Sequence, residues 1–480
     1  MTTLSTTENV TAKVDAAVRA FDRLRRTSPT ERAELLEAVA QALEANAATL
    51  IPLAQAESHL PQARLTGELA RTTYQLRSFA QLLRAGDFAE VIIDHAKTDT
   101  PLGPTPDLRR HLIPLGPVAM FSASNFPFAF SVAGGDTASA LAAGCSVIVK
   151  AHSGHPELSA TTAAVVRDAL VSAGAPDGTL DVVYGQQSGI ALLQDPRIAA
   201  GAFTGSTWGG RALFDVAAAR QRPIPFYGEL GSVNPVVVSR EASKAKADAI
   251  ATGLVDSFTL GAGQFCTKPG VIFVPEGSTI PKLAQNALAD APAQALLNDR
   301  ITAAYADSEA HFHQVAGVDT LVLGAVTDVG VTPSLFRTTL GNLLEHAGTL
   351  LEERFGPSVI LVEYPAGADL ASLLDSFEGS LTVTIHALDT GDVGIGDALD
   401  RASLIAGRIV WNGWPTGVAV SAAMTHGGPY PSATSALHTS VGVTAIRRFQ
   451  RPVSYQNVPD LGLPESLRNA NPLGLVRAVK

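Results

Sequence analysis

The cysteine at position 266 is the residue of this chain whose neighbours best suit it for chemistry. It lies in the run Gly-Ala-Gly-Gln-Phe-Cys-Thr at 261–267. Glycine has no Cβ and lets other groups approach closely, so we expect the thiol to be presented on a loop as a nucleophile rather than packed. The other cysteine, Cys145, begins the strand-like run Ser-Val-Ile-Val. We expect it to be a small buried hydrophobe.

A nucleophilic thiol needs a base and a group that stabilises charge on oxygen. Glu229 lies between glycines just before an expected strand, and Glu353 precedes another strand. Asn125 follows a strand and is either a turn residue or an amide donor to a developing oxyanion. Taken alone, Glu229 would be an ordinary solvated loop carboxylate and Glu353 an ordinary acidic helix end.

A glycine-rich turn at 203–210, Phe-Thr-Gly-Ser-Thr-Trp-Gly-Gly, follows an expected strand and opens an expected helix. Backbone N–H groups near Gly205, Ser206 and Gly210 could therefore face a phosphate at the helix N-terminus. The turn does not match the G-x-G-x-x-G fingerprint, and by itself it is weak evidence.

Metal and serine-hydrolase sites are not predicted. His311 and His313 are two residues apart and would not share a helix face. His152 and His155 lack a cysteine or carboxylate at ligand spacing. No G-x-S-x-G pattern occurs at a convincing strand–helix turn.

The elements that must position these residues begin with a helix. Ser28 and Glu31 form a predicted capping box with proline at the first helical position, and residues 35, 39 and 43 repeat on one apolar face. From about residue 115 short apolar strands alternate with helices, which predicts βαβ crossovers and a parallel sheet covered on both faces. The expected strands are 117–121, 146–149, 180–184 and 199–203, and the expected helices are 131–143 and 156–172.

A second strand–helix series begins near residue 233. Its expected strands are 236–239, 271–274, 359–362, 381–385 and 408–411. The chain is therefore predicted to be an α/β protein with a doubly wound domain, 1–96 and 115–231, followed by a second α/β domain, 232–444. The proline-rich segments 97–114 and 445–480 are expected to be arms or edge strands.

Composition restricts the class of protein. The chain has 480 residues, of which 46% are hydrophobic and 17% charged, and this excludes a mainly disordered chain. The net charge of −10 argues against binding to nucleic acid or to an anionic membrane surface. Neither a secretory signal nor a long apolar run is visible, so we expect a soluble, cytoplasmic protein with reduced thiols.

Six short motifs carry a family resemblance because they occur together in one order. The chain resembles the NAD(P)-dependent aldehyde dehydrogenase superfamily over nearly its whole length. Segments 133–145, 414–418 (Trp-Pro-Thr-Gly-Val) and 426–431 (His-Gly-Gly-Pro-Tyr-Pro) are similar to its 2-oxoglutarate semialdehyde (2,5-dioxopentanoate) dehydrogenase branch. The six motifs are Ser-Asn-Phe-Pro (124–127), Val-Lys-Ala-His (149–152), Phe-Thr-Gly-Ser-Thr (203–207), Glu-Leu-Gly (229–231), Gly-Gln-Phe-Cys (263–266) and Glu-Arg-Phe-Gly-Pro (353–357).

The resemblance implies a role for each matched residue. Cys266 matches the nucleophile, Glu229 the general base and Asn125 the oxyanion amide. The matched cofactor residues are Lys150 at the adenosine ribose, Gly205, Ser206 and Gly210 near the pyrophosphate, and Glu353 and Phe355 at the nicotinamide ribose and ring. Phe126 and Phe265 are expected to line the aldehyde channel. The first domain would bind the cofactor, the second would hold the nucleophile, and the arm would pair subunits into a homodimer or homotetramer.

The implied reaction is attack of the Cys266 thiolate on an aldehyde, hydride transfer to the nicotinamide, and hydrolysis of the thioester by water that Glu229 activates. Ser153 stands where many NAD-preferring relatives have a glutamate. A carboxylate there would repel a 2′-phosphate, so we expect NADP to be accepted and preferred over NAD.

The substrate and three rival functions stay open. A distal carboxylate on a semialdehyde would need a cation, and Arg109, Arg110, Lys268 and His426 are candidates, although the two arginines equally suit an arm or subunit contact. The rivals are an acylating, coenzyme-A-dependent dehydrogenase, a non-catalytic protein on the same fold, and a thiol esterase that uses Cys266.

Overall fold

The first sheet of the computed structural model has five parallel strands in the order β5-β4-β3-β6-β7. The structure describes residues 5–388 and 391–480. Starting from the middle strand, the chain builds outward to both edges, which is the doubly wound arrangement that alternating strands and helices predict. The strands are β3 (Val118–Phe121), β4 (Val147–Lys150), β5 (Leu180–Val183), β6 (Ala200–Thr204) and β7 (Phe226–Glu229).

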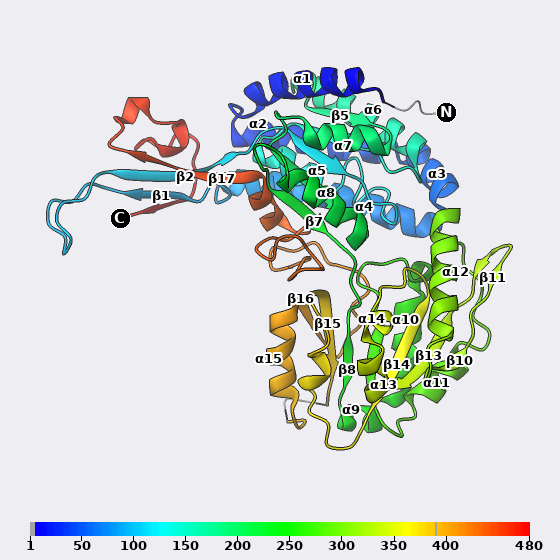
Figure 1. The fold of residues 1–480 in the computed structure, drawn as a ribbon. Helices are drawn as coiled ribbons and strands as arrows, with labels where there is room; N and C mark the ends of the chain where they lie inside the picture. The colour runs from blue at the N-terminus through cyan, green and yellow to red at the C-terminus, as the bar shows by residue number, and fades with distance from the viewer. Residues whose placement is uncertain (1–4, 389–390) are drawn as a thin grey trace.

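Helices cover both faces of this sheet (Figure 1). On one face α1 (Thr7–Leu24), α7 (Gln186–Gln194) and α8 (Thr207–Ala218) share an apolar cluster with the strands. The other face is covered by α2 (Pro29–Ala45), α4 (Gln62–Ala85), α5 (Gly135–Ala143) and α6 (Pro156–Ser172), with α3 (Ala47–Ser58) against α4 and α6.

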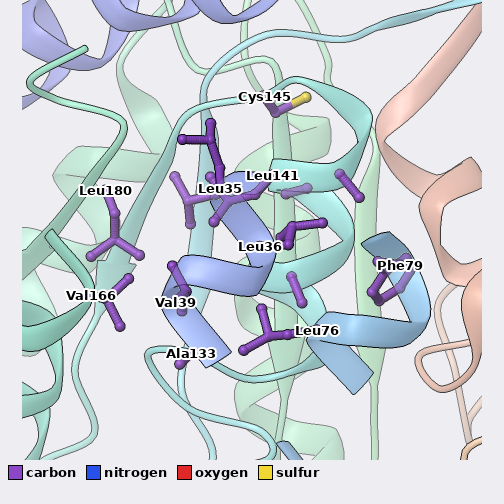
Figure 2. Close-up of a cluster of buried hydrophobic side chains, with 14 of the residues drawn as sticks. Leu35, Leu36, Val39, Leu76, Phe79, Ala133, Leu141, Cys145, Val166 and Leu180 are labelled. Carbon is purple, nitrogen blue, oxygen red and sulfur yellow. The ribbon is translucent and has the colours of Figure 1, made fainter. Parts of the chain in front are cut away.

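The start of α2 and its apolar face confirm the sequence analysis. The hydroxyl of Ser28 accepts from the backbone N–H of Glu31, whose carboxylate accepts from the backbone N–H of Ser28. Figure 2 shows the inner face of α2 packed with α4 and Cys145 in one hydrophobic cluster. Cys145 is fully buried, as predicted.

A second sheet has seven strands in the order β10-β13-β14-β9-β8-β15-β16, parallel except for the β10–β13 pair. All five strands that the sequence predicts for this half are present. The strands are β8 (Val236–Val238), β9 (Val271–Pro275), β10 (Asp319–Val322), β13 (Ser334–Thr339), β14 (Ser358–Tyr364), β15 (Ser380–His386) and β16 (Ala406–Trp411). The short strands β11 (Val326–Thr327) and β12 (Gly330–Val331) pair apart from it.

Two separate apolar clusters flank the second sheet. One includes α9 (Arg240–Ala245), α10 (Ala247–Thr259) and α11 (Ile280–Ala287), and the other includes α13 (Leu340–Glu345), α14 (Ala347–Leu350) and α15 (Ile395–Ile405). The helix α12 (Asp299–His313) stands at the side of the second sheet and reaches toward the first domain in Figure 1.

A third, four-stranded sheet projects from the body of the molecule (Figure 1). Its order is β17-β2-β1-β18, formed by β17 (Gln450–Gln456), β2 (Leu108–Pro114), β1 (Val91–Asp94) and β18 (Arg477–Val479). Three of these strands lie in the segments expected to be arms or edge strands. The exception is β1, which pairs with β2 and β18. It lies before residue 97, the residue at which the sequence analysis starts the arm.

Within residues 5–388 and 391–480, no helix combines the length and the apolar character needed to cross a membrane.

Candidate active site

The loop that carries Cys266 is bent by left-handed backbone. It connects α10 and the 3-10 turn η1 (Leu260–Gly263) to β9. Gly261 and Gly263 have φ of 56° and 69°, and a Cβ on Gly263 would lie 2.2 Å from the carbonyl oxygen of Gly356. Glycine is required there because a side chain would be both strained and obstructed. The loop leaves Cys266 partly exposed, which agrees with its predicted presentation.

A buried asparagine, Asn234, holds this loop in place through hydrogen bonds. The side-chain amide of Asn234 donates to the carbonyl oxygens of Cys266 and Lys268 at 2.8 and 2.9 Å, and its oxygen accepts from Thr382. Asn234 is fully buried with φ of 55°. Sequence analysis missed this residue, because an Asn-Pro pair normally indicates no more than a turn.

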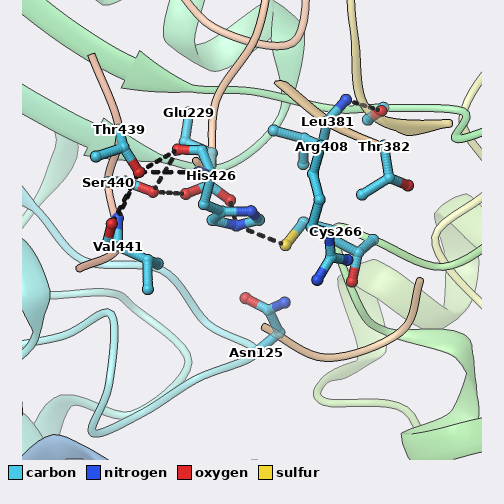
Figure 3. Close-up of polar contacts among 12 residues, drawn as sticks. Asn125, Glu229, Cys266, Leu381, Thr382, Arg408, His426, Thr439, Ser440 and Val441 are labelled. Atoms are coloured by element: carbon cyan, nitrogen blue, oxygen red, sulfur yellow. Dashed lines mark hydrogen bonds and ion pairs between the residues drawn. The ribbon is translucent and has the colours of Figure 1, made fainter. Parts of the chain in front are cut away.

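The other expected catalytic groups lie at carboxyl ends of strands in the first sheet. Glu229 ends β7, and Asn125 lies in the loop after β3. The carboxyl ends of parallel strands meet at one edge, which is where open α/β sheets bind ligands. Asn125 is buried, and its amide donates to the carbonyl oxygen of Gln264 at 3.1 Å. Figure 3 shows this amide pointing toward the space beside the Cys266 sulfur.

Glu229 is held by two residues from the segment before η3 (Val443–Phe449). One carboxylate oxygen lies 2.7 Å from Nε2 of His426, and the other accepts from the hydroxyl of Ser440 at 2.6 Å. The same Nε2 lies 3.4 Å from the sulfur of Cys266 (Figure 3). The sulfur, the ring nitrogen and a carboxylate oxygen therefore gather within 4.8 Å of one another.

Burial and neighbouring charge change the acidity of both Glu229 and Cys266. Burial would raise the pKa of Glu229, but the contacts with His426 and Ser440 outweigh it and lower that pKa. Burial and the charge of Glu229 raise the pKa of the Cys266 thiol well above its usual range. The carboxylate is therefore held in its charged form, whereas the thiol resists losing its proton.

A cavity of about 1210 Å³ extends from Cys266 and Glu229 across the edge of the first sheet. It exceeds the ~300–1,000 Å³ of ordinary small-ligand pockets, so it has room for a dinucleotide. The expected cofactor residues on its wall are Lys150, Ser153, Gly205, Ser206, Glu353 and Phe355.

The helix α8 begins at this cavity. Ser206 caps it by accepting from the backbone N–H of Gly209 at 3.2 Å, which directs the helix N-terminus toward the cavity wall. Gly210 is not on that wall. A Cβ at Gly210 would lie 2.0 Å from the side chain of Leu230, so this glycine allows α8 to pack closely.

Glu353 lies at the inner part of the cavity beside Gly231. A Cβ at Gly231 would lie 2.3 Å from a Glu353 carboxylate oxygen, so only glycine leaves room for this carboxylate. Burial raises the pKa of Glu353 to about 7, although a hydrogen bond from the backbone of Ser232 acts to lower it. Burial also lowers the pKa of Lys268 to about 7.

The expected channel residues lie outside the large cavity. The rings of Phe126 and Phe265 meet edge to face at 5.4 Å, and the guanidinium of Arg64 lies over both, 5.0 and 4.6 Å from their centroids. Arg64 also donates to the carbonyl oxygen of Asn125 at 2.7 Å. Phe126 follows Asn125 and Phe265 precedes Cys266 in the chain, and neither ring is on the wall of the cavity.

The four cations considered for a substrate carboxylate have other partners. Arg109 donates to Asp107, Asn469 and the carbonyl of Leu467 within the third sheet region, and Arg110 lies near Glu90. Lys268 is buried and donates to the carbonyl of Ser358 at 2.7 Å. His426, as described above, contacts Glu229 and Cys266. The structure thus offers none of the four as a free anchor.

Two arginines of α4 that the sequence analysis missed lie closer to the reacting groups. Arg71 lies over the ring of Phe130 at 5.4 Å, and its charge acts on both Cys266 and Glu229. Within the described residues, the Nη1 atoms of Arg71 and Arg64 are buried without a hydrogen-bond partner. Nothing near either arginine in the sequence marks it, because α4 reads as an ordinary amphipathic helix.

Comparison with known proteins adds the following. A model of a family described as "Aldehyde dehydrogenase family" matches residues 2–450. The chain is 41% identical to an alpha-ketoglutaric semialdehyde dehydrogenase of Acinetobacter baylyi, over 99% of this chain and 91% of the relative. It is 44% identical to alpha-ketoglutaric semialdehyde dehydrogenase 2 of Azospirillum brasilense, over 95% and 88%. The fold matches an NAD-dependent aldehyde dehydrogenase of Sinorhizobium meliloti with a TM-score of 0.80 and 23% identity, over 96% of this chain and 88% of that one.

Proposed function

Because this chain belongs to the aldehyde dehydrogenase family, we propose that it oxidises 2,5-dioxopentanoate to 2-oxoglutarate with NADP as the preferred hydride acceptor. The observation that carries the proposal is the meeting of Cys266, Glu229 and Asn125 at one end of a dinucleotide-sized cavity. The substrate is supported by the names of two relatives, which are 41% and 44% identical over nearly the whole chain.

The residues divide the reaction between them. Cys266 attacks the aldehyde carbon, and Asn125 donates to the oxygen that becomes negative. The cofactor, when bound, supplies the hydride acceptor. Glu229 takes a proton from water, which hydrolyses the thioester and restores the thiol. A carboxylate held beside the nucleophile is what hydrolysis needs, so we favour free acid over acyl-coenzyme A as the product.

The wall of the cavity supports the choice of NADP. Ser153 carries no charge that would repel a 2′-phosphate, and Arg300 is close enough to act on Lys150, so two cations share this region. Burial lowers the pKa of His152 to about 3, so its ring is neutral. Its Nδ1 accepts from the backbone N–H of Gly154, which leaves Nε2 as a donor.

We assign Arg71 and Arg64 as the cations that hold the distal carboxylate of the substrate. Arg64 lies over the two rings next to Asn125 and Cys266, and Arg71 lies over Phe130, whose ring meets that of Phe126 at 5.4 Å. Each arginine has a buried Nη1 without a partner in the described part of the chain. A carboxylate that accepts from such donors gains charge-assisted hydrogen bonds. A simple aliphatic aldehyde cannot make these bonds.

The assembly is part of the proposal. Both edges of the third sheet, β17 and β18, lack a neighbouring strand within the described chain. An unpaired edge can pair with another chain, so we propose that this sheet forms the contact of a homodimer or homotetramer.

A substrate panel tests the function. The purified protein is assayed with 2,5-dioxopentanoate, succinic semialdehyde, glutaraldehyde and butanal, each with NAD and with NADP, and the product is identified with and without coenzyme A. We expect the highest kcat/KM for 2,5-dioxopentanoate with NADP and a free acid as product. A higher value for another aldehyde, for NAD, or formation of acyl-coenzyme A would overturn the corresponding part.

A further inference from the structure

We propose that His426 is a catalytic base that takes the proton from the Cys266 thiol as the sulfur attacks the aldehyde. This inference rests on the proposed function in one respect, that Cys266 is the nucleophile. It gives His426 a different role from the carboxylate anchor considered in the sequence analysis.

One ring nitrogen of His426 lies close to both the Cys266 sulfur and the Glu229 carboxylate. Nε2 of His426 lies 3.4 Å from the Cys266 sulfur and 2.7 Å from a carboxylate oxygen of Glu229. The first distance is within hydrogen-bond reach for sulfur, so the thiol can pass its proton along this line. The second puts a negative charge beside the imidazolium that would result. For Nε2 to take this proton, the neutral ring carries its own proton on Nδ1, and the N–H that then forms at Nε2 donates to Glu229.

The ring is fixed in this position. His426 is only 1% exposed, and its backbone N–H donates to the hydroxyl of Thr439 at 2.8 Å. Its carbonyl oxygen accepts from the backbone N–H of Ser440 at 2.8 Å, and the ring packs against Phe130 with centroids 6.2 Å apart. A base held in this way needs no rearrangement to reach the sulfur.

The surroundings of the thiol explain why a base is needed. Burial and Glu229 raise the pKa of Cys266, and the charge of Glu353 adds to this. Arg71 acts in the opposite direction, and Arg408 also faces Cys266, but together they do not offset burial and the two carboxylates. A thiol in these surroundings does not ionise unaided at neutral pH, so attack requires a group that accepts its proton.

Glu229 also contacts the Cys266 thiol, but its low basicity leaves it poorly suited to do this work alone. One of its oxygens accepts from Ser440, the other faces Nε2, and its pKa is lowered. A carboxylate with a lowered pKa is a weak base toward a thiol whose pKa is raised. Imidazole is the stronger base, and Glu229 stabilises its protonated form.

The step balances as follows. The S–H bond of Cys266 breaks, its proton forms an N–H bond at Nε2 of His426, and the sulfur electron pair forms the bond to the aldehyde carbon. The carbonyl electron pair moves to oxygen, where Asn125 donates to it. After hydride transfer and attack by water, the thiolate leaves the acyl carbon and regains the proton from His426. The proton that Glu229 takes from water is released to solvent.

Alkylation of Cys266 by iodoacetamide tests the inference without any aldehyde. The rate is followed by mass spectrometry of the peptide that contains Cys266, between pH 5 and 10, for the wild type, His426→Gln and His426→Phe. His438→Gln is the matched control. His438 lies in the same segment as His426, but its half-buried ring packs on Tyr227 and does not contact Cys266. Base catalysis typically contributes ~10²–10⁴-fold, so both His426 variants should react about 10²-fold more slowly at pH 7, and their rates should still be rising at pH 10.

The pH dependence of alkylation in the wild type tests the role of His426 even if the variants do not fold. Proton transfer to His426 makes the wild-type alkylation rate level off below the ordinary thiol pKa of ~8.5. A rate that still climbs above pH 9 would overturn the inference, as would His426 variants with the wild-type profile. If no aldehyde were oxidised but these profiles held, the proposed function would fail while the role of His426 stood.

Chemical rescue separates catalysis from structure. His426→Ala removes the ring, and added imidazole should restore alkylation and aldehyde oxidation at least about tenfold, within the ~10²–10⁴-fold that base catalysis contributes. Pyrazole has the same size and shape but is far less basic, so it should restore neither. Equal rescue by both, or rescue by neither in a folded variant, would assign His426 to packing alone and overturn the inference.

Discussion

The carboxyl of Glu353 costs the unliganded protein stability, and Glu353→Gln should remove that cost. Burial raises the pKa of this carboxyl from 4.5 to about 7. At ~1.4 kcal/mol per pH unit this corresponds to about 3 kcal/mol. Because the carboxyl lines an open cavity, we expect about 1–3 kcal/mol in practice.

The direction of the pH dependence of stability follows from the pH range in which the folded and the unfolded chain hold the proton of Glu353. Folded protein keeps the proton of Glu353 up to about pH 7, whereas the unfolded chain loses it near 4.5. Stability that depends on the protonated form is therefore complete below pH 4.5, falls between 4.5 and 7, and stays low above pH 7. Glutamine does not titrate, so the variant should match the wild type near pH 4.5 and exceed it increasingly up to about pH 7.

Urea unfolding of the cofactor-free proteins at pH 5, 6, 7 and 8 measures this difference. The matched control is Glu352→Gln, the exposed neighbour. Lys268, with a pKa of about 7, titrates in the same range, but its contribution is present in wild type and variant and is largely removed by subtraction. The same variant should bind NADP more weakly, because a neutral amide replaces a charged acceptor. An advantage of Glu353→Gln that is equal at pH 5 and 8, or a less stable variant at pH 8, would refute the reasoning.

Three further changes have expected outcomes. Asn125→Ala should lower kcat by about 10²–10³-fold, because one oxyanion donor is lost, and steady-state kinetics measure it; an unchanged kcat would remove Asn125 from the site. Ser153→Glu should lower the ratio of kcat/KM for NADP over NAD by at least about tenfold through repulsion of the 2′-phosphate. Arg71→Met should lower kcat/KM about 10–100-fold more for 2,5-dioxopentanoate than for butanal, since a hydrogen bond to a charged group contributes about 1.5–3 kcal/mol; equal losses would contradict its assignment.

Local pattern predicts most of the fold. Apolar runs of four to six residues between helical segments are enough to locate strands β3 to β6 and five of the seven strands of the second sheet, because parallel strands covered on both faces must be continuously hydrophobic. The strands β10 and β13 are not among those predicted. The capping box at Ser28 marks its helix end because both partners lie within one turn. In contrast, β1 is missed as a member of the third sheet, since its partners lie near residues 110 and 478 and distant pairing leaves no local pattern.

The candidate site divides in the same way. Cys266, Glu229 and Asn125 are found because each lies in a short motif with unusual neighbours. His426 is singled out by the sequence but assigned another role, because its contacts with Glu229 and Cys266 bridge more than 150 residues of chain. Asn234, Arg64 and Arg71 carry no local signal at all. Their functions depend on which distant groups the fold places beside them.

The burial of Cys145 has a practical consequence. Since this side chain has no exposed surface and burial raises its pKa to about 11, a thiol reagent added to the native protein should consume one equivalent per chain. The concentration of active sites in a preparation can then be measured from the reactive Cys266 thiol instead of from the total protein mass. Denaturation before titration doubles the count and supplies the internal reference.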